Sequence, residues 1–214
     1  MALYKRIPWK PGRRRKCCFA YGQPFVLHQR REVYSDPGVD PFEAKNLQNR
    51  EKTVCFTGHR QIGDWEQTAR ELCVLLEKLY QQGFRDFISG AALGFDQLAA
   101  RCVVALRRKH PDVRLILAIP CPDQSLRWTN LQAHDYEQLI YLCDETRVLS
   151  PYYYDGCMQV RNQYMVDHSS MCIAYMKHMS RSGTIATMRY ALSQDVPLIN
   201  IAVTGAVQEY VTLP

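Results

Sequence analysis

The sequence has no apolar run that approaches the length of a membrane-spanning helix, and its nine cysteines form no Cys-x-x-Cys pair. The first absence argues against an integral membrane protein. The second removes the usual spacing of zinc sites, and an odd number of cysteines does not suit a framework of disulfides. Several cysteines fall at apolar positions, where cysteine acts as a small hydrophobic residue in a reducing compartment. We therefore expect a cytoplasmic protein without a metal site.

Two sequence patterns of well-known enzymes are also missing. No G-x-G-x-x-G stretch follows an apolar run, so the fingerprint of NAD-dependent dehydrogenases is absent. Ser, His and Asp do not occur in an order that supports a hydrolase triad. Any binding chemistry must therefore come from another arrangement of glycine and polar residues.

Acidic residues are scarce in the first 50 residues, which hold 11 Lys and Arg against 4 Asp and Glu, a net charge of +7. The remaining residues hold 16 against 17, a net charge of −1. A basic segment of this kind can contact nucleic acid, although a solvated tail is the favoured interpretation. Five prolines interrupt the segment, and a short strand at 25–27 is the one regular element considered there. We expect residues 1–50 to form an irregular arm and residues 51–214 to form one domain.

The stretch from Thr53 to Asp96 organises that domain. The apolar run Val54–Phe56 ends at Thr57-Gly58-His59-Arg60, and the run Asp86–Ser89 ends at a glycine-containing turn before a helix. Two strands that end in small-residue turns, with a helix between them, are typical of a βαβ unit. Such turns allow backbone N–H groups to approach a phosphate at a helix N-terminus.

The alternation of strands and helices continues to the C-terminal part of the chain. Strands are expected at residues 54–56, 86–89, 113–119, 147–149, 171–175 and 197–201. Helices are expected after Asp64, from Phe95 to about His110, from Asp123 or Ser125 to about Leu142, over 158–169 and over 184–194. This order predicts an α/β fold, a Rossmann-like three-layer sandwich with a doubly wound, mainly parallel sheet.

In such a fold the ligand binds beyond the carboxyl ends of the strands, near the point where the strand order reverses. The residues that follow the strands are therefore the candidates for ligand binding. They are Thr57, Gly58, His59, Arg60, Ser89, Gly90, Gly94, Asp96, Trp128, Arg161, Asn162, Ser182, Gly183 and Thr184. We expect the glycine loops to meet in one crevice, and we expect Gly94→Val to abolish binding while the fold stays intact.

Each candidate also has a structural explanation. Arg60 suits a phosphate but also a surface salt bridge. Asp96 suits ribose hydroxyls, yet a carboxylate near a helix start also complements the helix dipole. Trp128 suits stacking on a base, although a single tryptophan is more often part of a core. Ser182 is equally an ordinary helix cap.

Three motifs follow one another along the chain, namely Cys55–Arg60, Ser89–Asp96 and Arg161–Ser169. Together they resemble the YpsA-like family of the SLOG superfamily, which also contains the DprA and LOG proteins. The resemblance covers about residues 53–202 and implies a Rossmann-like fold that binds a nucleotide or a nucleotide derivative, such as an ADP-ribose- or NAD-like ligand.

The LOG proteins are phosphoribohydrolases, and this resemblance implies a second set of roles. Arg161 matches their arginine, but Asn162 stands where they have lysine. Gly183 and Thr184 match their Gly-Thr pair, whereas Thr187 stands where they have glutamate. Threonine cannot stabilise an oxocarbenium ion or activate water as a carboxylate does. Asp96 and Arg161 therefore remain the catalytic candidates if a reaction occurs.

Three functions stay open at this point. The favoured one is a nucleotide-binding sensor or regulator, with a small nucleotide-type molecule as partner and a homodimer left open. The second is an N-glycoside hydrolase that acts on nucleotides. The third is a DprA-like nucleic-acid binder that uses the basic arm.

Overall fold

The computed structural model describes residues 50–178, 182–202 and 208–209 of the 214 residues. The predictions for the basic arm, including its boundary and the short strand at 25–27, lie outside these residues. They stay predictions.

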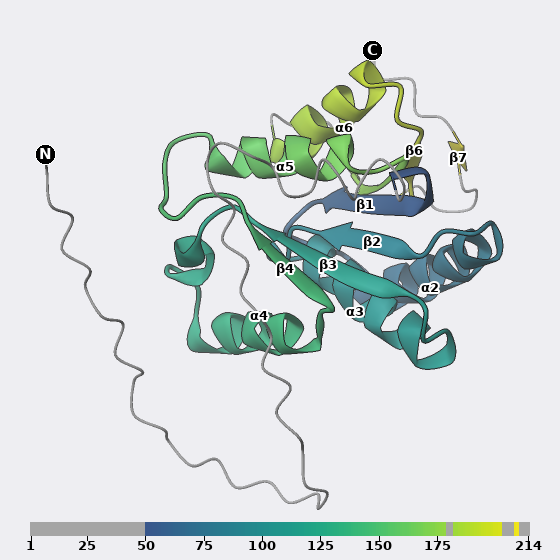
Figure 1. The fold of residues 1–214 in the computed structure, drawn as a ribbon, viewed down its shortest axis with the longest axis horizontal. Helices are drawn as coiled ribbons and strands as arrows, with labels where there is room; N and C mark the ends of the chain where they lie inside the picture. The colour runs from purple at the N-terminus through teal and green to yellow at the C-terminus, as the bar shows by residue number, and fades with distance from the viewer. Residues whose placement is uncertain (1–49, 179–181, 203–207, 210–214) are drawn as a thin grey trace, which may run out of the picture. The chain divides into compact units, whose positions relative to one another are not determined.

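The described residues form a sheet with helices on both faces (Figure 1). The strands are β1 (Thr53–Gly58), β2 (Asp86–Ser89), β3 (Arg114–Ile119), β4 (Glu145–Val148), β5 (Met171–Tyr175), β6 (Leu198–Asn200) and β7 (Gln208–Glu209). The helices are α2 (Trp65–Gln81), α3 (Phe95–Lys109), α4 (Asn130–Leu142), α5 (Cys157–Asp167) and α6 (Gly183–Ser193), with 3-10 turns η1 (Arg50–Lys52) and η2 (Pro122–Ser125). The predicted α/β architecture is confirmed.

The strand order is β4-β3-β2-β1-β5-β6-β7. Strands β1 to β6 are parallel, and β7 pairs with β6 in the antiparallel direction. The order runs outward from β1 to β4 on one side and from β5 to β6 on the other. The reversal of strand order therefore lies between β1 and β5, and a ligand crevice is expected beyond their carboxyl ends.

Alternate residues of the strands feed two separate hydrophobic cores. In β1, Val54 and Phe56 pack with α2, α3 and α4, whereas Cys55 packs with α5 and α6 on the opposite face. Figure 1 shows the same division, with α5 and α6 on one side of the sheet and the other helices below it. Burial on both faces explains why the strands are continuous apolar runs in the sequence.

Strand β4 begins at Glu145, two residues before its expected start, and two further elements differ in kind from the sequence prediction. The expected helix from Asp123 or Ser125 to Leu142 is divided, because Thr129 begins α4 with a capping box in which Thr129 and Gln132 each accept the other's backbone N–H. A Thr-x-x-Gln spacing is a known signal for a helix start, so the sequence contained this information. The second difference is β7, a strand of two residues that follows the expected last strand.

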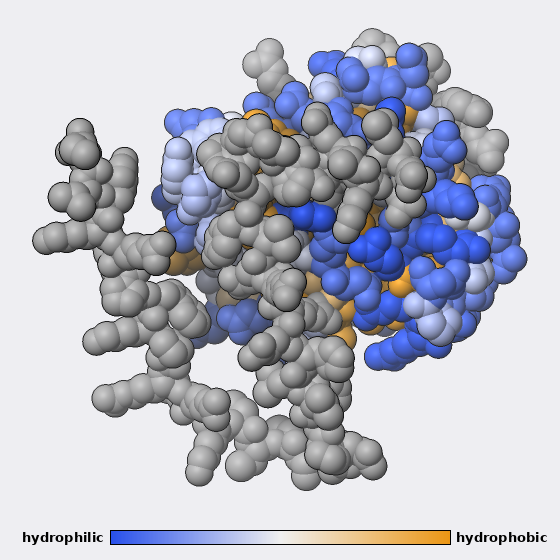
Figure 2. All heavy atoms as spheres, viewed as in Figure 1, coloured by the Kyte–Doolittle hydropathy of each residue, from blue (hydrophilic) through white to orange (hydrophobic). Residues whose placement is uncertain are grey.

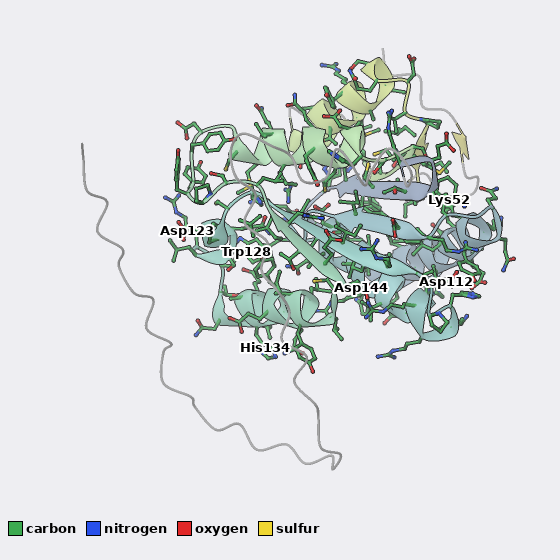
Figure 3. All side chains as sticks on the ribbon, viewed as in Figure 1. Lys52, Asp112, Asp123, Trp128, His134 and Asp144 are labelled. Carbon is green, nitrogen blue, oxygen red and sulfur yellow. The ribbon has the colours of Figure 1, made fainter. Side chains whose placement is uncertain are left out.

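The amino ends of β2, β3 and β4 carry ion pairs, and these ends point away from the crevice. Arg114 contacts Glu145 at 2.8 Å and Asp86 at 3.5 Å, and Arg85 contacts Asp112 at 2.7 Å. Figure 2 shows hydrophilic surface on this side, where Figure 3 labels Asp112. Among the described helices, none is long and apolar enough to cross a membrane.

Candidate functional site

A cavity of about 390 Å³ lies beyond the carboxyl ends of β1, β2, β3 and β5. Its walls come from the loops after these strands and from the first turns of α5 and α6. Figure 3 labels Trp128 at this end of the sheet, far from Asp112 at the other end. The cavity therefore occupies the position that the strand order predicts for a ligand.

Most of the residues proposed from the sequence line this cavity. They are Thr57, Gly58, His59, Arg60, Asp96, Trp128, Arg161, Asn162, Ser182, Gly183 and Thr184. Three proposed residues, Ser89, Gly90 and Gly94, are not among the lining residues and support the loops behind it. Four lining residues were not proposed: Ala92, Leu93, Gln124 and Met158.

Two glycines allow the β1–α2 and β2–α3 loops to cross at close range. A side-chain carbon at Gly58 would lie 2.5 Å from Cβ of Phe95, and one at Gly94 would lie 2.4 Å from the backbone oxygen of Arg60. The Phe95 N–H donates to the oxygen of His59 at 3.1 Å across the same crossing. These glycines are thus required for the packing of the two loops.

This geometry corrects the expectation for Gly94→Val. Gly94 has a φ of +90°, a region that L side chains rarely adopt, and its Cβ position meets the backbone of Arg60. A valine would strain the loop crossing itself. The substitution is therefore a change to the fold and not a clean test of binding.

Arg161 is the most deeply placed cation of the site, with 4 % of its surface exposed. Its Nη1 donates to the oxygen of Gly90 at 2.5 Å and to the oxygen of Ala118 at 3.4 Å, and its Nε donates to Oδ1 of Asn162 at 2.8 Å. Burial lowers the pKa of Arg161, whereas the nearby Asp96 raises it. Arg161 therefore ties α5 to the carboxyl ends of β2 and β3.

Asp96 lies in the first turn of α3 and is 6 % exposed. Burial raises the pKa of Asp96 to about 6, although the charge of Arg161 and a hydrogen bond from the Ala92 N–H act in the opposite direction. A side-chain carbon at Gly90 would lie 2.2 Å from Nη1 of Arg161 and 2.8 Å from Oδ2 of Asp96. Glycine at position 90 thus leaves the space in which the two charged groups converge.

Ser89 fixes the start of this loop. Its hydroxyl donates to the backbone oxygen of Asp96 at 2.8 Å and accepts the N–H of Ala91 at 3.1 Å. Ser89 is fully buried, so it contributes to the cavity only through the position of Asp96.

The N-terminus of α6 forms the wall beyond β5. The Ser182 hydroxyl accepts the Ile185 N–H at 3.4 Å, and the next residues, Gly183 and Thr184, line the cavity. Thr187 is 3 % exposed and donates its hydroxyl to the oxygen of Gly183 at 2.8 Å. At the position that carries glutamate in LOG proteins, this chain therefore has a hydroxyl that is bonded within its own helix.

The β1–α2 loop adds two basic side chains to the cavity. The Nε2 atom of His59 is buried and has no hydrogen-bond partner among the described residues. Arg60 is exposed at the rim. Unpaired buried polar atoms are rare in folded proteins, which makes His59 a candidate for contact with a bound molecule.

Trp128 and Met158 add apolar surface to the cavity. Trp128 packs edge-on against Tyr136, with 5.4 Å between the ring centroids, and is half-buried. Met158 stands at the start of α5 on the other wall. Trp128 therefore packs against the core, as the structural explanation predicted, and also lines the cavity, while its stacking on a base stays a prediction.

Gln124 is the missed residue with the most contacts to the site. Its Nε2 donates to the oxygen of Gly90 at 3.2 Å, and its Oε1 lies 3.5 Å from Nη1 of Arg161. It is buried although η2 is a surface turn. Nothing in the local sequence distinguishes this glutamine from an exposed one.

Within residues 50–178, 182–202 and 208–209, no group of three His, Cys, Asp or Glu side chains is arranged to hold a metal ion. The described cysteines are free thiols.

Comparison with protein families gives a match over most of the described domain. The model of the YpsA family, described as the YspA SLOG family, matches residues 67–200. This range includes α3, the η2–α4 region, α5 and α6. The resemblance inferred from the three motifs is confirmed.

Individual relatives agree with this match. The uncharacterized SPbeta prophage-derived protein YoqJ of Bacillus subtilis is 35% identical over 132 residues, which cover 56% of this chain and 77% of YoqJ. A UPF0398 protein of Halalkalibacterium halodurans is 24% identical over 55% of this chain and 68% of its own length.

Among solved structures, DNA processing protein A from Helicobacter pylori is similar with a TM-score of 0.52 and 20% identity. The similarity covers 73% of this chain and 67% of that chain. That structure concerns the single-stranded DNA binding mode of the Helicobacter protein. At this identity the likeness concerns the fold alone.

Proposed function

The chain belongs to the YspA SLOG family, and from the chemistry of its cavity we propose that it binds a nucleotide or nucleotide derivative as a sensor or regulator. The observation that carries this proposal is the convergence of the loops after β1, β2, β3 and β5 on one cavity of about 390 Å³. Cavities of this size accept small organic ligands.

One end of the cavity suits a phosphate group. The first N–H groups of a helix lack intrahelical partners, and together with the helix dipole they attract anions. In this chain α6 begins at the cavity wall, and Arg60 and the unpaired Nε2 of His59 stand on the adjoining loop. Asn162, one residue after Arg161, lies near Gly183 and adds an amide to this end.

The other end of the cavity suits a planar base. Trp128, Met158 and Leu93 are apolar lining residues, and a half-buried tryptophan provides a flat surface for stacking. A molecule with an anionic end and an aromatic end matches this division. Nucleoside phosphates, ADP-ribose and NAD all have this character.

A thermal-shift panel of AMP, GMP, ADP, ADP-ribose and NAD tests the proposal. A ligand present at about 100 times its Kd adds roughly 2.7 kcal/mol to the free energy of unfolding, which gives a measurable rise in Tm. If no member of the panel raises the Tm, nucleotide binding is refuted for these ligands.

Two tryptophan variants locate the binding. Trp128→Ala is expected to reduce the ligand-induced rise in Tm, because it removes the stacking surface. Trp65→Ala is the matched control, since Trp65 is exposed at the start of α2 and does not line the cavity. Equal loss of the ligand effect in both variants would argue against the cavity as the binding site.

N-glycoside hydrolysis is the second candidate, and Asp96 is the observation that favours it. A buried carboxyl group whose pKa is raised to about 6 can exchange a proton near neutral pH. In this reaction the bond between the sugar C1′ and the base nitrogen breaks, and water supplies the new oxygen at C1′. Chromatography for free base and sugar phosphate after incubation with AMP tests this activity, and Asp96→Asn is expected to abolish it.

A further inference from the structure

Asp96 is the one carboxylate among the described residues that line the cavity. Its recorded polar contacts are the hydrogen bond from the Ala92 N–H and the attraction of Arg161. An ionised carboxylate has room for about four hydrogen bonds, and a buried one is costly when it lacks donors. Asp96 therefore has acceptor capacity left for hydrogen-bond donors that enter the cavity.

Two of the three guanidinium nitrogens of Arg161 donate hydrogen bonds to groups other than Asp96. Its Nη1 contacts the oxygens of Gly90 and Ala118, and its Nε contacts Asn162. The ion pairs found among the described residues do not include one between Arg161 and Asp96 within 4.0 Å. Arg161 thus acts on Asp96 through its charge and through the position of the Gly90 loop, as a positioning residue.

The strand order sets which part of a ligand meets Asp96. The α6 N-terminus follows β5 and Trp128 follows β3, and β1 and β2 lie between these strands. Neighbouring strands lie roughly 4.7–4.9 Å apart, so the carboxyl ends of β3 and β5 are about 14 Å apart. Asp96 follows β2, between the anion-binding end and the apolar end, and its negative charge disfavours a phosphate there.

In a nucleotide the sugar lies between the phosphate and the base. We infer that Asp96, positioned by Arg161, accepts the 2′ and 3′ hydroxyls of the ligand, so that the site selects ribonucleotides over deoxyribonucleotides. The two neighbouring hydroxyls of a ribose can donate two hydrogen bonds to one carboxylate, and the free acceptor sites of Asp96 can accept both. This inference rests on the proposed function, because it assigns a sugar specificity to the same cavity.

Calorimetric titration of the full chain with AMP, GMP, CMP and UMP, each beside its 2′-deoxy and 3′-deoxy form, tests the inference without any substitution. We expect the deoxy forms to bind about 10- to 100-fold more weakly, which is the loss of a hydrogen bond to a charged group. Equal affinity for ribo and deoxy forms overturns the inference and leaves the proposed function standing. Absence of binding by every monophosphate here and by every ligand of the thermal-shift panel overturns both.

Asp96→Asn tests whether this carboxylate is responsible. The substitution keeps the shape of the side chain but removes its charge, so the ratio between ribo and deoxy affinities is expected to fall at least about fivefold toward unity. Asp123→Asn is the matched control, because Asp123 is exposed on η2 and does not line the cavity. A ratio that survives in Asp96→Asn would overturn the assignment to Asp96.

The pH profile of the same ratio tests the role of Arg161. The titratable groups around Asp96 are Arg161 on α5, the thiols of Cys55 and Cys172 on β1 and β5, and His59 beside β1. In the unsubstituted chain the selectivity is expected to weaken below about pH 6, where Asp96 takes up a proton. The midpoint of the profile is the pH at which half of the selectivity is lost. Arg161→Met should shift this midpoint to higher pH, because the positive charge that favours the ionised carboxylate is lost.

Arg161→Lys provides the comparison, since it keeps the charge and should keep the midpoint close to that of the unsubstituted chain. An unchanged midpoint in Arg161→Met would limit Arg161 to a packing role and overturn this part of the inference. If Arg161→Met does not fold, a midpoint in Arg161→Lys that departs widely from the unsubstituted chain would overturn it instead.

Discussion

At the scale of single residues, the site depends on charges that are held away from water. Asp96 and Arg161 are both almost fully buried, and each is stabilised in its charged form by the other. For Asp96 the cost of burial is larger than this attraction, because its pKa stays raised. A residue that is unfavourable for folding but faces a cavity is typical of a functional position.

This imbalance gives a prediction for Asp96→Asn. The folded state holds the Asp96 proton up to about pH 6, whereas the ordinary pKa is 3.8, so the folded state binds more protons between these values. The stability that Asp96 contributes in its protonated form is therefore lost as the pH rises through about 6. This difference between the folded and ordinary pKa of Asp96 corresponds to about 3 kcal/mol in the free energy of unfolding.

We expect the unfolding free energy of Asp96→Asn to gain about 3 kcal/mol relative to the unsubstituted chain between about pH 4 and pH 7. Urea denaturation of the ligand-free protein at several pH values measures this difference. The contributions of titratable groups that both chains share cancel in the comparison. A difference that does not change with pH would show that Asp96 titrates as an exposed carboxyl group does.

At the scale of elements, the loop crossing between β1–α2 and β2–α3 depends on Gly94. Gly94 and Gly83 both have positive φ, +90° and +98°, but the Cβ position of Gly83 has no atom within 4 Å. Alanine at Gly83 costs about 1–2 kcal/mol for the positive φ, and alanine at Gly94, whose ψ of −123° lies outside the left-handed helical region, costs about 1–3 kcal/mol for the backbone conformation. Gly94→Ala adds the collision with the backbone of Arg60, about 1–3 kcal/mol for overpacking.

Gly83→Ala is therefore the matched control for Gly94→Ala, and thermal or urea unfolding gives the difference in stability. Comparable losses in the two variants would mean that the crossing relaxes easily and that the site tolerates movement of the Gly94 loop.

The elements themselves follow largely from the sequence. Apolar runs gave the strands Asp86–Ser89 and Met171–Tyr175 with the observed bounds, because both faces of the sheet are covered. The division between η2 and α4 was predicted wrongly, although Thr129 and Gln132 carried the signal of a helix start. Strand β7 has two residues, which is too short for a period of alternation to be recognised.

The candidate site is less readable from the sequence than the fold. Gly58 and the helix start at Ser182 line the cavity as expected, because their place follows from strand order, whereas Gly90 and Gly94 lie behind the lining residues of their loop. The contacts of Arg161 and Gln124 with the Gly90 oxygen cannot be predicted from the sequence, because they depend on how α5 and η2 pack on the ends of β2 and β3. Side-chain direction at such positions is a property of the tertiary structure.

At the scale of the whole molecule, the parallel sheet has different features at the two ends of its strands. We call these ends the amino edge and the carboxyl edge. The amino edge carries exposed ion pairs such as Arg85 with Asp112, which contribute little to stability individually. The carboxyl edge carries the cavity, where glycine, a helix start and buried charges are brought together. The asymmetry follows from topology, because every strand from β1 to β6 points in the same direction.

This arrangement predicts where a nucleotide changes amide hydrogen exchange. A ligand in the cavity should slow exchange in loops that are far apart in sequence, since they share one binding site and local opening must break its contacts. The segments expected to respond are 57–60, 92–96, 122–128, 158–162 and 182–184. Turns 82–85 and 110–113 at the amino edge are the internal control and should exchange at unchanged rates. Protection confined to one of the cavity loops, or equal protection at both edges, would contradict a single binding site formed by four strand ends.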